Sequence, residues 1–348
     1  MKALVEKLRA GRDLTASDIN YAMSLLLSDS TDDKTKADFL IALHRKGESV
    51  EEIVAFVQQL IDRAIDPLID PKNLSGPMID VCGTGGDGLD LFNVSTTVMF
   101  VLAAGGAAVV KHGNRAVTSR SGSADVLEAL GVQIALPPAK SKECAERHGL
   151  CFIFAREYHP AYRAIAEMRK RLARENIRTV FNLLGPLLNP TRPPRQLIGV
   201  FAPHLTTIFA EALRRLGRER AWIVHGVTDS GEGMDDISTS GVTTFAELLN
   251  GKVTTGLIDP RWLNIPAAPL DELRGGDATE NAGYVEGILS GKIQGPKRDL
   301  TLVNAGGGFV VAGLCNDMNQ GLARAREEID SGRALEKLRA LQHFGAVS

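Results

Sequence analysis

The spacing of apolar residues changes near position 78, and this change limits the fold more than any other feature of the 348-residue sequence. Residues 1–66 show only helical spacing, and Ser49 with Glu52 predicts a capping box at one helix start. Residues 66–77 contain three prolines and are typical of a connector. Beyond them, short apolar runs alternate with helical stretches, which predicts an α/β layer with a largely parallel, buried sheet. The runs are MIDVC, AAVV, CFIF, LIGVF, AWIVH and TLVNA.

The composition limits the classes of function. With 44% hydrophobic and 24% charged residues, the chain is typical of a folded globular protein. A net charge of -2 argues against a general nucleic-acid binder. The longest apolar stretch, residues 98–110, is too short to span a bilayer, and the first residues lack the apolar core of a secretory signal. The four cysteines form no Cys-x-x-Cys pair, which predicts free thiols in a reducing cytoplasm.

A basic stretch interrupts the alternation. Residues 159–178 predict an amphipathic helix with Ile165, Met168 and Leu172 on one side. Its arginines are consistent with a solvated face, with nucleic-acid binding, or with one arginine directed at an anionic ligand. The absence of an aromatic ladder favours the solvated face.

The glycine-rich sequence GTGGDG, residues 83–88, follows the run MIDVC and fits the pattern G-x-G-x-x-G. A dinucleotide-binding turn would require a helix to begin at the third glycine and an acid at the end of the next strand. Here the helix is expected only at NVST, with Ser95 and Thr96 as N-caps, and the next strand ends in Lys111. Asp87 also adds a carboxylate within the loop. These features favour a phosphorylated, metal-bound ligand over a dinucleotide.

Donors for such a ligand are expected from several segments. Gly83, Gly85 and Gly86 allow close backbone approach, and a helix N-terminus favours an anion. Ser123 has an alternative role as the N-cap of the following helix. The expected side chains are Asn93, Ser95, Thr96, Lys111, Arg115, Ser119, Ser121 and Ser123.

Adjacent carboxylates occur at Asp235 and Asp236, in the glycine-rich stretch 225–239. Their spacing does not fit a calcium-binding EF-hand, but a carboxylate pair that leaves room for water and phosphate suits Mg²⁺. A helix cap or a turn is the alternative interpretation of this pair.

Taken together, DVCGTGGDG, FNVST, KHGNRAVTSRSGSADVLEALG, FNLLGPLLNP and NAGGGFVVAG resemble the anthranilate phosphoribosyltransferase family over almost the whole chain. The resemblance implies a small all-helical domain plus a larger α/β domain with a central, largely parallel sheet flanked by helices. It implies a helical domain of residues 1–70, joined by an inserted segment at about 159–185, and an α/β domain of residues 76–158 and 186–348. It also implies a cytoplasmic homodimer that contacts its partner through the helical domain.

The activity implied by the resemblance belongs to tryptophan biosynthesis. Anthranilate and phosphoribosyl pyrophosphate would give N-(5-phosphoribosyl)anthranilate and pyrophosphate with Mg²⁺, and no nucleic acid or membrane would be involved. The metal would be held by Ser95, Asp235 and Asp236. Lys111, Asn114 and Arg169 would position the substrates without a dedicated acid or base, with Arg169 facing the anthranilate carboxylate. The implied substrate-binding residues are Gly83, Gly86, Asp87, Leu91, Asn93, Val94, Ser95, Thr96, Lys111, His112, Gly113, Asn114, Arg115, Ser119, Ser123, His159 and Arg169.

The sequence departs from the family pattern at three places. Asp236 stands where the family has Glu, Leu91 replaces a hydroxyl residue, and about three residues are added near ARENIR. Two other interpretations stay open. A pyrimidine nucleoside phosphorylase would share the scaffold but need no essential magnesium, and an inactive relative would bind nucleic acid through residues 163–178.

Overall fold

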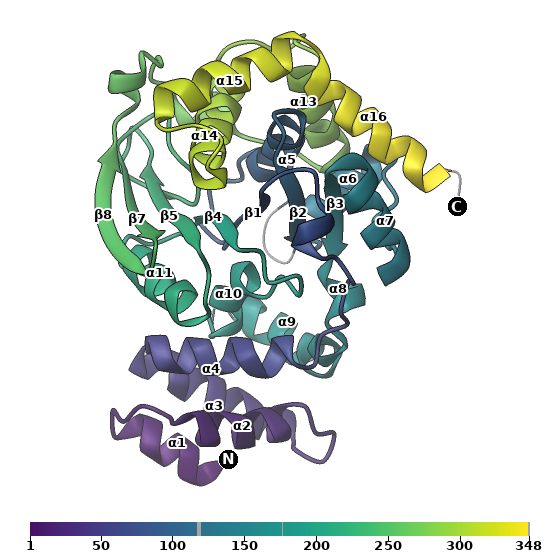
Figure 1. Cartoon of the computed structure of the whole chain (residues 1–348). Helices are drawn as coiled ribbons and strands as arrows, with labels where there is room; N and C mark the ends of the chain where they lie inside the picture. Colours follow the sequence, from purple (N-terminus) through teal and green to yellow (C-terminus); the bar gives the residue numbers. More distant parts are fainter. Residues whose placement is uncertain (117–119, 176, 347–348) are drawn as a thin grey trace.

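The N-terminal part of the computed structural model is helical; the structure describes residues 1–116, 120–175 and 177–346. Three of its helices start where a short polar side chain accepts one of the first free N–H groups: Thr15, Asp32 and Ser49 are the N-caps of the second, third and fourth helices. The helices are α1 (Lys2–Arg9), α2 (Ala16–Leu26), α3 (Asp33–Lys46) and α4 (Val50–Ile61), which lie below the sheet in Figure 1.

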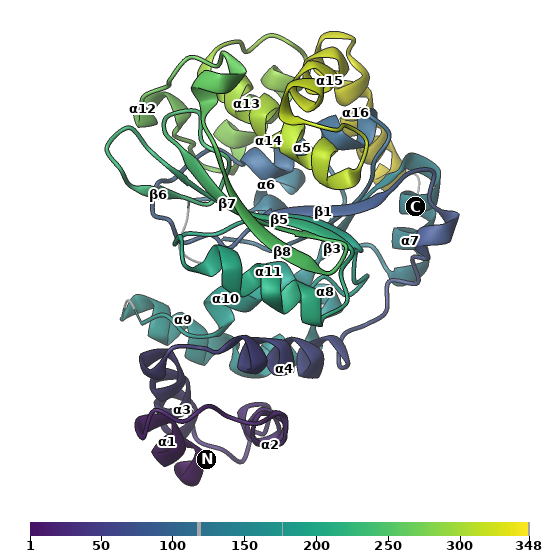
Figure 2. The ribbon, with the colours of Figure 1, turned by 60° about the vertical axis from the view of Figure 1, so that its left-hand side comes forward.

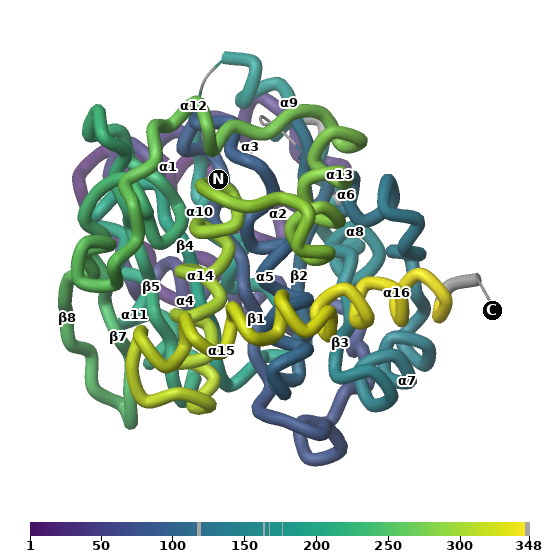
Figure 3. The backbone as a smooth tube through the Cα atoms, turned by 90° about the horizontal axis from the view of Figure 1, so that it is seen from above, coloured from purple at the N-terminus to yellow at the C-terminus, as the bar shows by residue number. Residues whose placement is uncertain are grey.

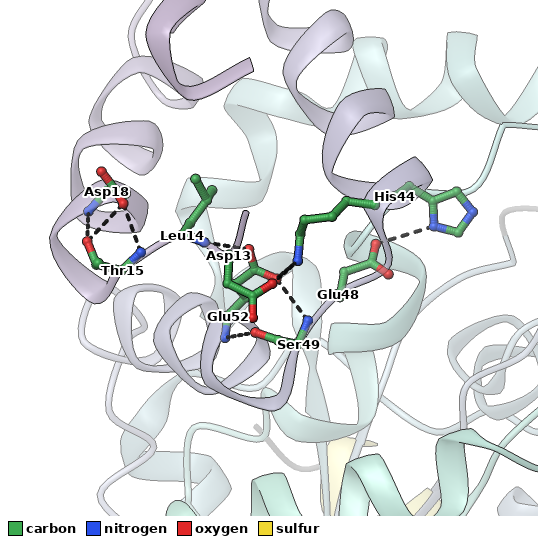
Figure 4. Close-up of polar contacts among 9 residues, drawn as sticks. Asp13, Leu14, Thr15, Asp18, His44, Glu48, Ser49 and Glu52 are labelled. Atoms are coloured by element: carbon green, nitrogen blue, oxygen red, sulfur yellow. Dashed lines mark hydrogen bonds and ion pairs between the residues drawn. The ribbon is translucent and has the colours of Figure 1, made fainter. Parts of the chain in front are cut away.

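A buried carboxylate holds this helical part together (Figure 4). Oε1 of Glu52 accepts a hydrogen bond from the backbone N–H of Leu14 at 2.9 Å, and Oε2 accepts one from the N–H of Ser49 at 2.8 Å. Lys46 Nζ lies 2.7 Å from the same Oε2. The predicted capping box at Ser49 is confirmed, and its Glu52 also joins the loop between α1 and α2 to the start of α4.

The sheet lies in the larger part of the chain, and its order is β3-β2-β1-β4-β5-β7-β8, with β6 paired to β5. The pairs from β3 to β5 are parallel, whereas β6, β7 and β8 join in antiparallel fashion. The prediction of a largely parallel sheet is therefore confirmed. The strands are β1 (Met78–Gly83), β2 (Ala108–Gly113), β3 (Leu150–Phe154), β4 (Arg195–Gly199), β5 (Arg220–Val227), β6 (Gly233–Met234), β7 (Thr243–Leu249) and β8 (Lys252–Ile258).

Helices cover both faces of the sheet, as Figure 2 shows. Successive residues of a strand point to opposite faces, so Leu197 packs into one hydrophobic cluster and Ile198 into the other. The first cluster includes helices α5 and α14, and the second includes α11 together with the N-terminal helices. These helices are α5 (Val94–Ala104), α14 (Pro296–Ala312) and α11 (Leu205–Arg215).

The remaining helices complete the two layers, and α15 and α16 cross the molecule when it is viewed from above (Figure 3). Among the described residues, no helix is long and apolar enough to cross a membrane. The bounds are α6 (Ser123–Ala129), α7 (Pro138–His148), α8 (Ala155–Tyr158), α9 (Ala166–Arg174), α10 (Phe181–Leu184), α12 (Leu270–Leu273), α13 (Ala278–Leu289), α15 (Met318–Asp330) and α16 (Arg333–Ala346).

Two predicted elements are wrong. TLVNA, predicted as a strand, lies inside α14, because an apolar run in a helix buried on all sides looks like a buried strand. The basic helix predicted for residues 159–178 is shorter: residues 160–165 form a 3₁₀ helix and α9 covers only Ala166–Arg174. Ile165, Met168 and Leu172 are nevertheless buried on one side, in the same cluster as the N-terminal helices.

Candidate functional site

The carboxyl ends of the parallel strands meet at one edge of the sheet and carry most of the predicted site residues. β2 and β3 lie on one side of β1, whereas β4 and β5 lie on the other. The direction of winding therefore reverses between β1 and β4, which is where open α/β sheets bind ligands. Gly83 and Gly199 end these two strands as a pair, and Gly113 ends β2.

The loop after β1 has the GTGGDG sequence and depends on its glycines for its shape. Gly85 and Gly86 have φ angles of 66° and 79°, which favour glycine. Gly83 has a different requirement, since a Cβ atom there would overlap the carboxylate of Asp235. The backbone N–H of Gly85 donates to Oδ2 of Asp235 at 2.6 Å. The loop and Asp235 thus fit closely against each other.

Asp87, Asp235 and Asp236 form an acidic cluster beside this loop. The backbone N–H of Asp235 lies 3.5 Å from Oδ2 of Asp87. Burial, with the nearby charge of Asp87, raises the pKa of Asp235 to about 7. Burial and the charge of Asp235 likewise raise the pKa of Asp236 well above its usual range. Both aspartates follow β6 in bends and not at a helix start, so the helix-cap interpretation of this pair does not apply.

Lys111 brings a buried positive charge to the same place. Its side chain is 1% exposed, and Nζ donates to the carbonyl oxygen of Val81 at 2.5 Å and to Oγ of Ser95 at 3.1 Å. Burial lowers the pKa of Lys111, although Asp235 and Asp236 act in the opposite direction. Lys111 and Ser95 are therefore brought together beside the acidic cluster.

The N-terminus of α5 faces the site, but its cap differs from the prediction. Asn93 is the N-cap, and Ser95 and Thr96 lie in the first turn, so the prediction of Ser95 and Thr96 as N-caps is wrong. Oγ1 of Thr96 is buried and has no hydrogen-bond partner among the described residues. Val94 points into the hydrophobic core, and Leu91 makes a short bridge to Arg274.

The segment after β2 is packed against α6. Oγ of Ser123 lies 3.4 Å from the carbonyl oxygen of Asn114, and a Cβ atom at Gly113 would overlap that hydroxyl. Gly122 is the N-cap of α6, so the alternative in which Ser123 is the cap is wrong. Arg115 pairs with Asp125 and Glu128 of α6 and does not provide a free cation. The predicted site residue Ser119 lies outside the described residues.

An aromatic cluster lies at the ends of β2 and β3. It consists of His112, His159, Tyr162 and Phe181, with ring centroids 5.3 Å apart for the histidines and 5.8 Å apart for each of the next two pairs. The guanidinium of Arg169, on α9, lies 5.2 Å from the Tyr162 ring and 5.6 Å from the Phe181 ring. The predicted residues His112, His159 and Arg169 are thus brought together.

Both histidines of the aromatic cluster are neutral at physiological pH. Burial lowers the pKa of His159 to about 4, and burial with the proximity of His159 lowers the pKa of His112 well below its usual range. Nε2 of His159 donates to the carbonyl oxygen of Leu188 at 2.7 Å. A buried cluster with neutral rings and one cationic guanidinium suits an aromatic ligand that carries one negative charge.

Sequence reasoning missed several residues at the site. Nδ2 of Asn281, on α13, donates to Oδ1 of Asn93 at 2.8 Å and to Oγ of Ser121 at 2.7 Å. Arg178 donates to the carbonyl oxygen of Gly86 at 2.8 Å and lies 4.1 Å from the ring centroid of Phe201. No local pattern identifies either residue, because each contact joins segments far apart in the chain.

The acidic cluster suits a divalent cation that takes only some of its ligands from the protein and the others from water or a bound phosphate. Its carboxylates are held near one another at a cost in electrostatic energy, which a cation would relieve. Within the described ranges, no group of three or more His, Cys, Asp or Glu side chains could hold a metal ion by itself. Mg²⁺ commonly combines one or two carboxylates with water and substrate phosphates, so this arrangement suits it.

Two family models match the chain. Residues 75–335 match the α/β domain of a glycosyl transferase family, and residues 2–64 match the helical bundle domain of the same family. Anthranilate phosphoribosyltransferases of Moorella thermoacetica and Haloferax volcanii are each 42% identical to this chain. The alignment covers 98% of this chain in both cases, with 97% of the Moorella protein and 99% of the Haloferax protein.

Solved structures show the same similarity. Anthranilate phosphoribosyltransferase from Thermus thermophilus is 39% identical, with a TM-score of 0.88 over 98% of both chains. The Saccharomyces cerevisiae enzyme in complex with PRPP and Mg is 27% identical, with a TM-score of 0.87 over 99% of this chain and 98% of that one. The same yeast enzyme with 4-fluoroanthranilate has a TM-score of 0.85 at 25% identity, with 99% of this chain and 98% of that one covered.

Proposed function

Because this chain belongs to the anthranilate phosphoribosyltransferase family, we propose that it transfers the phosphoribosyl group of phosphoribosyl pyrophosphate to the amine of anthranilate. The products are N-(5-phosphoribosyl)anthranilate and pyrophosphate, and the reaction belongs to tryptophan biosynthesis. The observation that carries this proposal is the placement of the two clusters. A glycine loop with an acidic cluster suits a metal-bound phosphorylated ligand, and the aromatic cluster with Arg169 lies at the neighbouring strand ends.

The chain's own residues supply positioning and charge. Lys111, fixed by Val81 and Ser95, keeps a positive charge beside the phosphorylated substrate. Arg169 binds the anthranilate carboxylate, and the neutral histidines place no further positive charge beside the aromatic amine, which is unprotonated at neutral pH. Holding the amine near the anomeric carbon is a proximity effect, which contributes up to about 7–11 kcal/mol to lowering a barrier. No dedicated general base is required.

Mg²⁺ would be held by Asp235, Asp236 and Ser95, and when bound it neutralises the negative charge of pyrophosphate. The remaining site residues keep their proposed roles at the phosphorylated substrate: Gly83, Gly86, Asp87, Asn93, Thr96, Asn114 and Ser123. The yeast relative solved with PRPP and Mg supports the choice of ion. The relatives do not favour a nucleoside phosphorylase or an inactive nucleic-acid-binding protein.

The domain division and the assembly are further proposals. The helical domain takes residues 1–70 and the segment 159–185, since Ile165 and Met168 share a hydrophobic cluster with the N-terminal helices. A cytoplasmic homodimer through the helical domain is consistent with Tyr21, an α2 side chain that is 56% exposed.

The direct test is the loss of anthranilate fluorescence in the complete mixture with phosphoribosyl pyrophosphate and Mg²⁺. Omission of either component should abolish it. Consumption without Mg²⁺, or no consumption in the complete mixture, would contradict the proposed function.

A further inference from the structure

We propose that Asp80 and Asn189, two buried residues to which no role has been assigned, are positioning residues for the two histidines of the aromatic cluster. This inference rests on the proposed function, because it specifies how the anthranilate side of the same site is held in shape. Asp80 lies within β1 and is 0% exposed, and Asn189 lies in the loop before β4 and is 1% exposed.

Asp80 binds two different segments with its two oxygens. Oδ1 accepts a hydrogen bond from the backbone N–H of His112 at 3.1 Å, and Oδ2 accepts one from Nδ2 of Asn189 at 3.0 Å. The first bond fixes the backbone of β2 at His112, one residue before the strand ends. The second fixes the loop that contains Asn189 and Leu188.

Both Nδ2 hydrogens and the Oδ1 atom of Asn189 are hydrogen-bonded within the protein. Its second Nδ2 hydrogen goes to the carbonyl oxygen of Val110 at 2.8 Å, and its Oδ1 accepts from the backbone N–H and the hydroxyl of Thr191 at 3.1 and 2.7 Å. An amide has two donor hydrogens and one acceptor oxygen, so a carboxylate or an apolar side chain cannot replace it without loss.

The residue before Asn189 completes the connection. The carbonyl oxygen of Leu188 accepts the hydrogen bond from Nε2 of His159. A continuous chain of contacts therefore runs from His112 through Asp80, Asn189 and Leu188 to His159. This chain of contacts fixes the backbone from which the His112 ring projects and binds the His159 ring directly.

The pairing is specific to the native residues. Asp80→Asn leaves one acceptor where two donors, from His112 and Asn189, must be satisfied. Asn189→Asp removes both donors and places a carboxylate opposite Asp80. We expect each change to raise KM for anthranilate about tenfold. Asp80→Asn also removes a charge that acts on Lys111, so only Asn189→Asp is expected to leave KM for phosphoribosyl pyrophosphate within about twofold.

The double variant Asp80→Asn/Asn189→Asp restores one donor facing one acceptor. It should bring KM for anthranilate part of the way back from its raised value in Asn189→Asp, as expected for two residues that share one hydrogen bond. Thr191→Val is a milder change, which removes only the hydroxyl bond to Asn189, and should raise KM for anthranilate about threefold. The KM values of Thr191→Val still test the positioning role if Asp80→Asn or Asn189→Asp fails to fold.

Glu52→Gln is the matched control, because Glu52 is also a fully buried carboxylate that accepts several hydrogen bonds, but it lies in the helical part. It should lower the melting temperature and leave both KM values unchanged. Equal changes of the two KM values in Asn189→Asp and Thr191→Val, or no change in either, would overturn the proposal.

Failure of the proposed function is recognised separately, since the wild-type protein would then consume no anthranilate. In that case the ring ¹⁵N resonances of His112 and His159 still test the positioning. They should shift in Asp80→Asn and Thr191→Val but not in Glu52→Gln, and unchanged resonances would reject it.

Discussion

At the scale of single residues, the carboxylates of the acidic cluster lower the stability of the free protein when they are charged, because they are buried close together. Burial and the nearby charge of Asp87 raise the pKa of Asp235 to about 7, so both its protonated and its charged form are populated near neutral pH. For an acid whose pKa is raised on folding, the associated stability is complete below the usual pKa and is lost as pH rises through the folded value, here about 7. The cluster therefore destabilises the free protein above neutral pH.

Replacing Asp235 and Asp236 together with Asn should separate stability from activity. Turnover should be nearly abolished, because the site loses the charge that would hold Mg²⁺. At pH 8 the free protein should gain about 1–2 kcal/mol in unfolding free energy, a value discounted because both side chains are partly exposed. Thermal melts from pH 5 to pH 8 measure this gain, which should shrink toward pH 5. A destabilised variant, or one that retains near-normal turnover at saturating Mg²⁺, would contradict this role.

Arg169 offers a second test at this scale. Its guanidinium is held over Tyr162 and Phe181, so its charge points to the aromatic cluster. A charge-assisted hydrogen bond contributes about 1.5–3 kcal/mol, so Arg169→Ala should raise KM for anthranilate about 10- to 100-fold and affect phosphoribosyl pyrophosphate little. Arg171→Ala, at an exposed position of the same helix, is the control. Equal weakening of both substrates would argue against a contact with the carboxylate.

At the scale of elements, the loop after β1 and the bend after β6 act as one unit. Gly83 and Gly199 allow the backbone and carboxylate of Asp235 to lie against the ends of two strands, where any side chain would overlap them. The geometry of the acidic cluster thus depends on glycines in β1 and β4, and not only on the acidic residues.

Gly83→Ala should therefore displace Asp235. A displacement of about 1 Å in a positioned group can lower a rate up to about 100-fold, so kcat/KM for phosphoribosyl pyrophosphate should fall about 10- to 100-fold. Gly88→Ala is the control. Gly88 has a φ of 77°, but an added Cβ atom there would meet no neighbouring atom, so the substitution adds backbone strain without overlap. Similar losses of activity in both variants would show that strain in the loop, and not the position of Asp235, matters.

The elements also show what the sequence can and cannot predict. Short apolar runs with flanking glycines predicted β1 to β5, since a parallel strand buried on both faces has a nearly continuous apolar sequence. TLVNA has the same character but continues into NAGGGFVVAG, where Gly306, Gly307 and Gly308 let α14 approach its neighbours closely. β7 and β8 were not predicted, because many of their side chains are polar or exposed.

At the scale of the whole molecule, the site draws on contacts between distant segments. The family resemblance of the motifs implied that Lys111, Asp235 and Asp236 belong to one site. They did not predict the contact of Arg178 with the glycine loop, the pairing of Arg115 with carboxylates of α6, or the contact of Asn281 with Asn93, since such contacts depend on how segments pack across the sheet.

The same convergence gives a test on the intact protein. A ligand that binds only the folded state raises its stability by about 2.7 kcal/mol at one hundred times its dissociation constant. For a protein of this size we expect phosphoribosyl pyrophosphate with Mg²⁺ to raise the melting temperature by about 4 °C. The shift should disappear in the Asp235→Asn/Asp236→Asn variant, which serves as the control.

NAD, NADP and FAD should give no shift, because the first helix after β1 begins at Val94, well beyond the glycine loop. The strand that follows also carries Lys111 in place of a ribose-binding acid. A shift with a dinucleotide and none with phosphoribosyl pyrophosphate would mean that the glycine loop binds a different class of ligand.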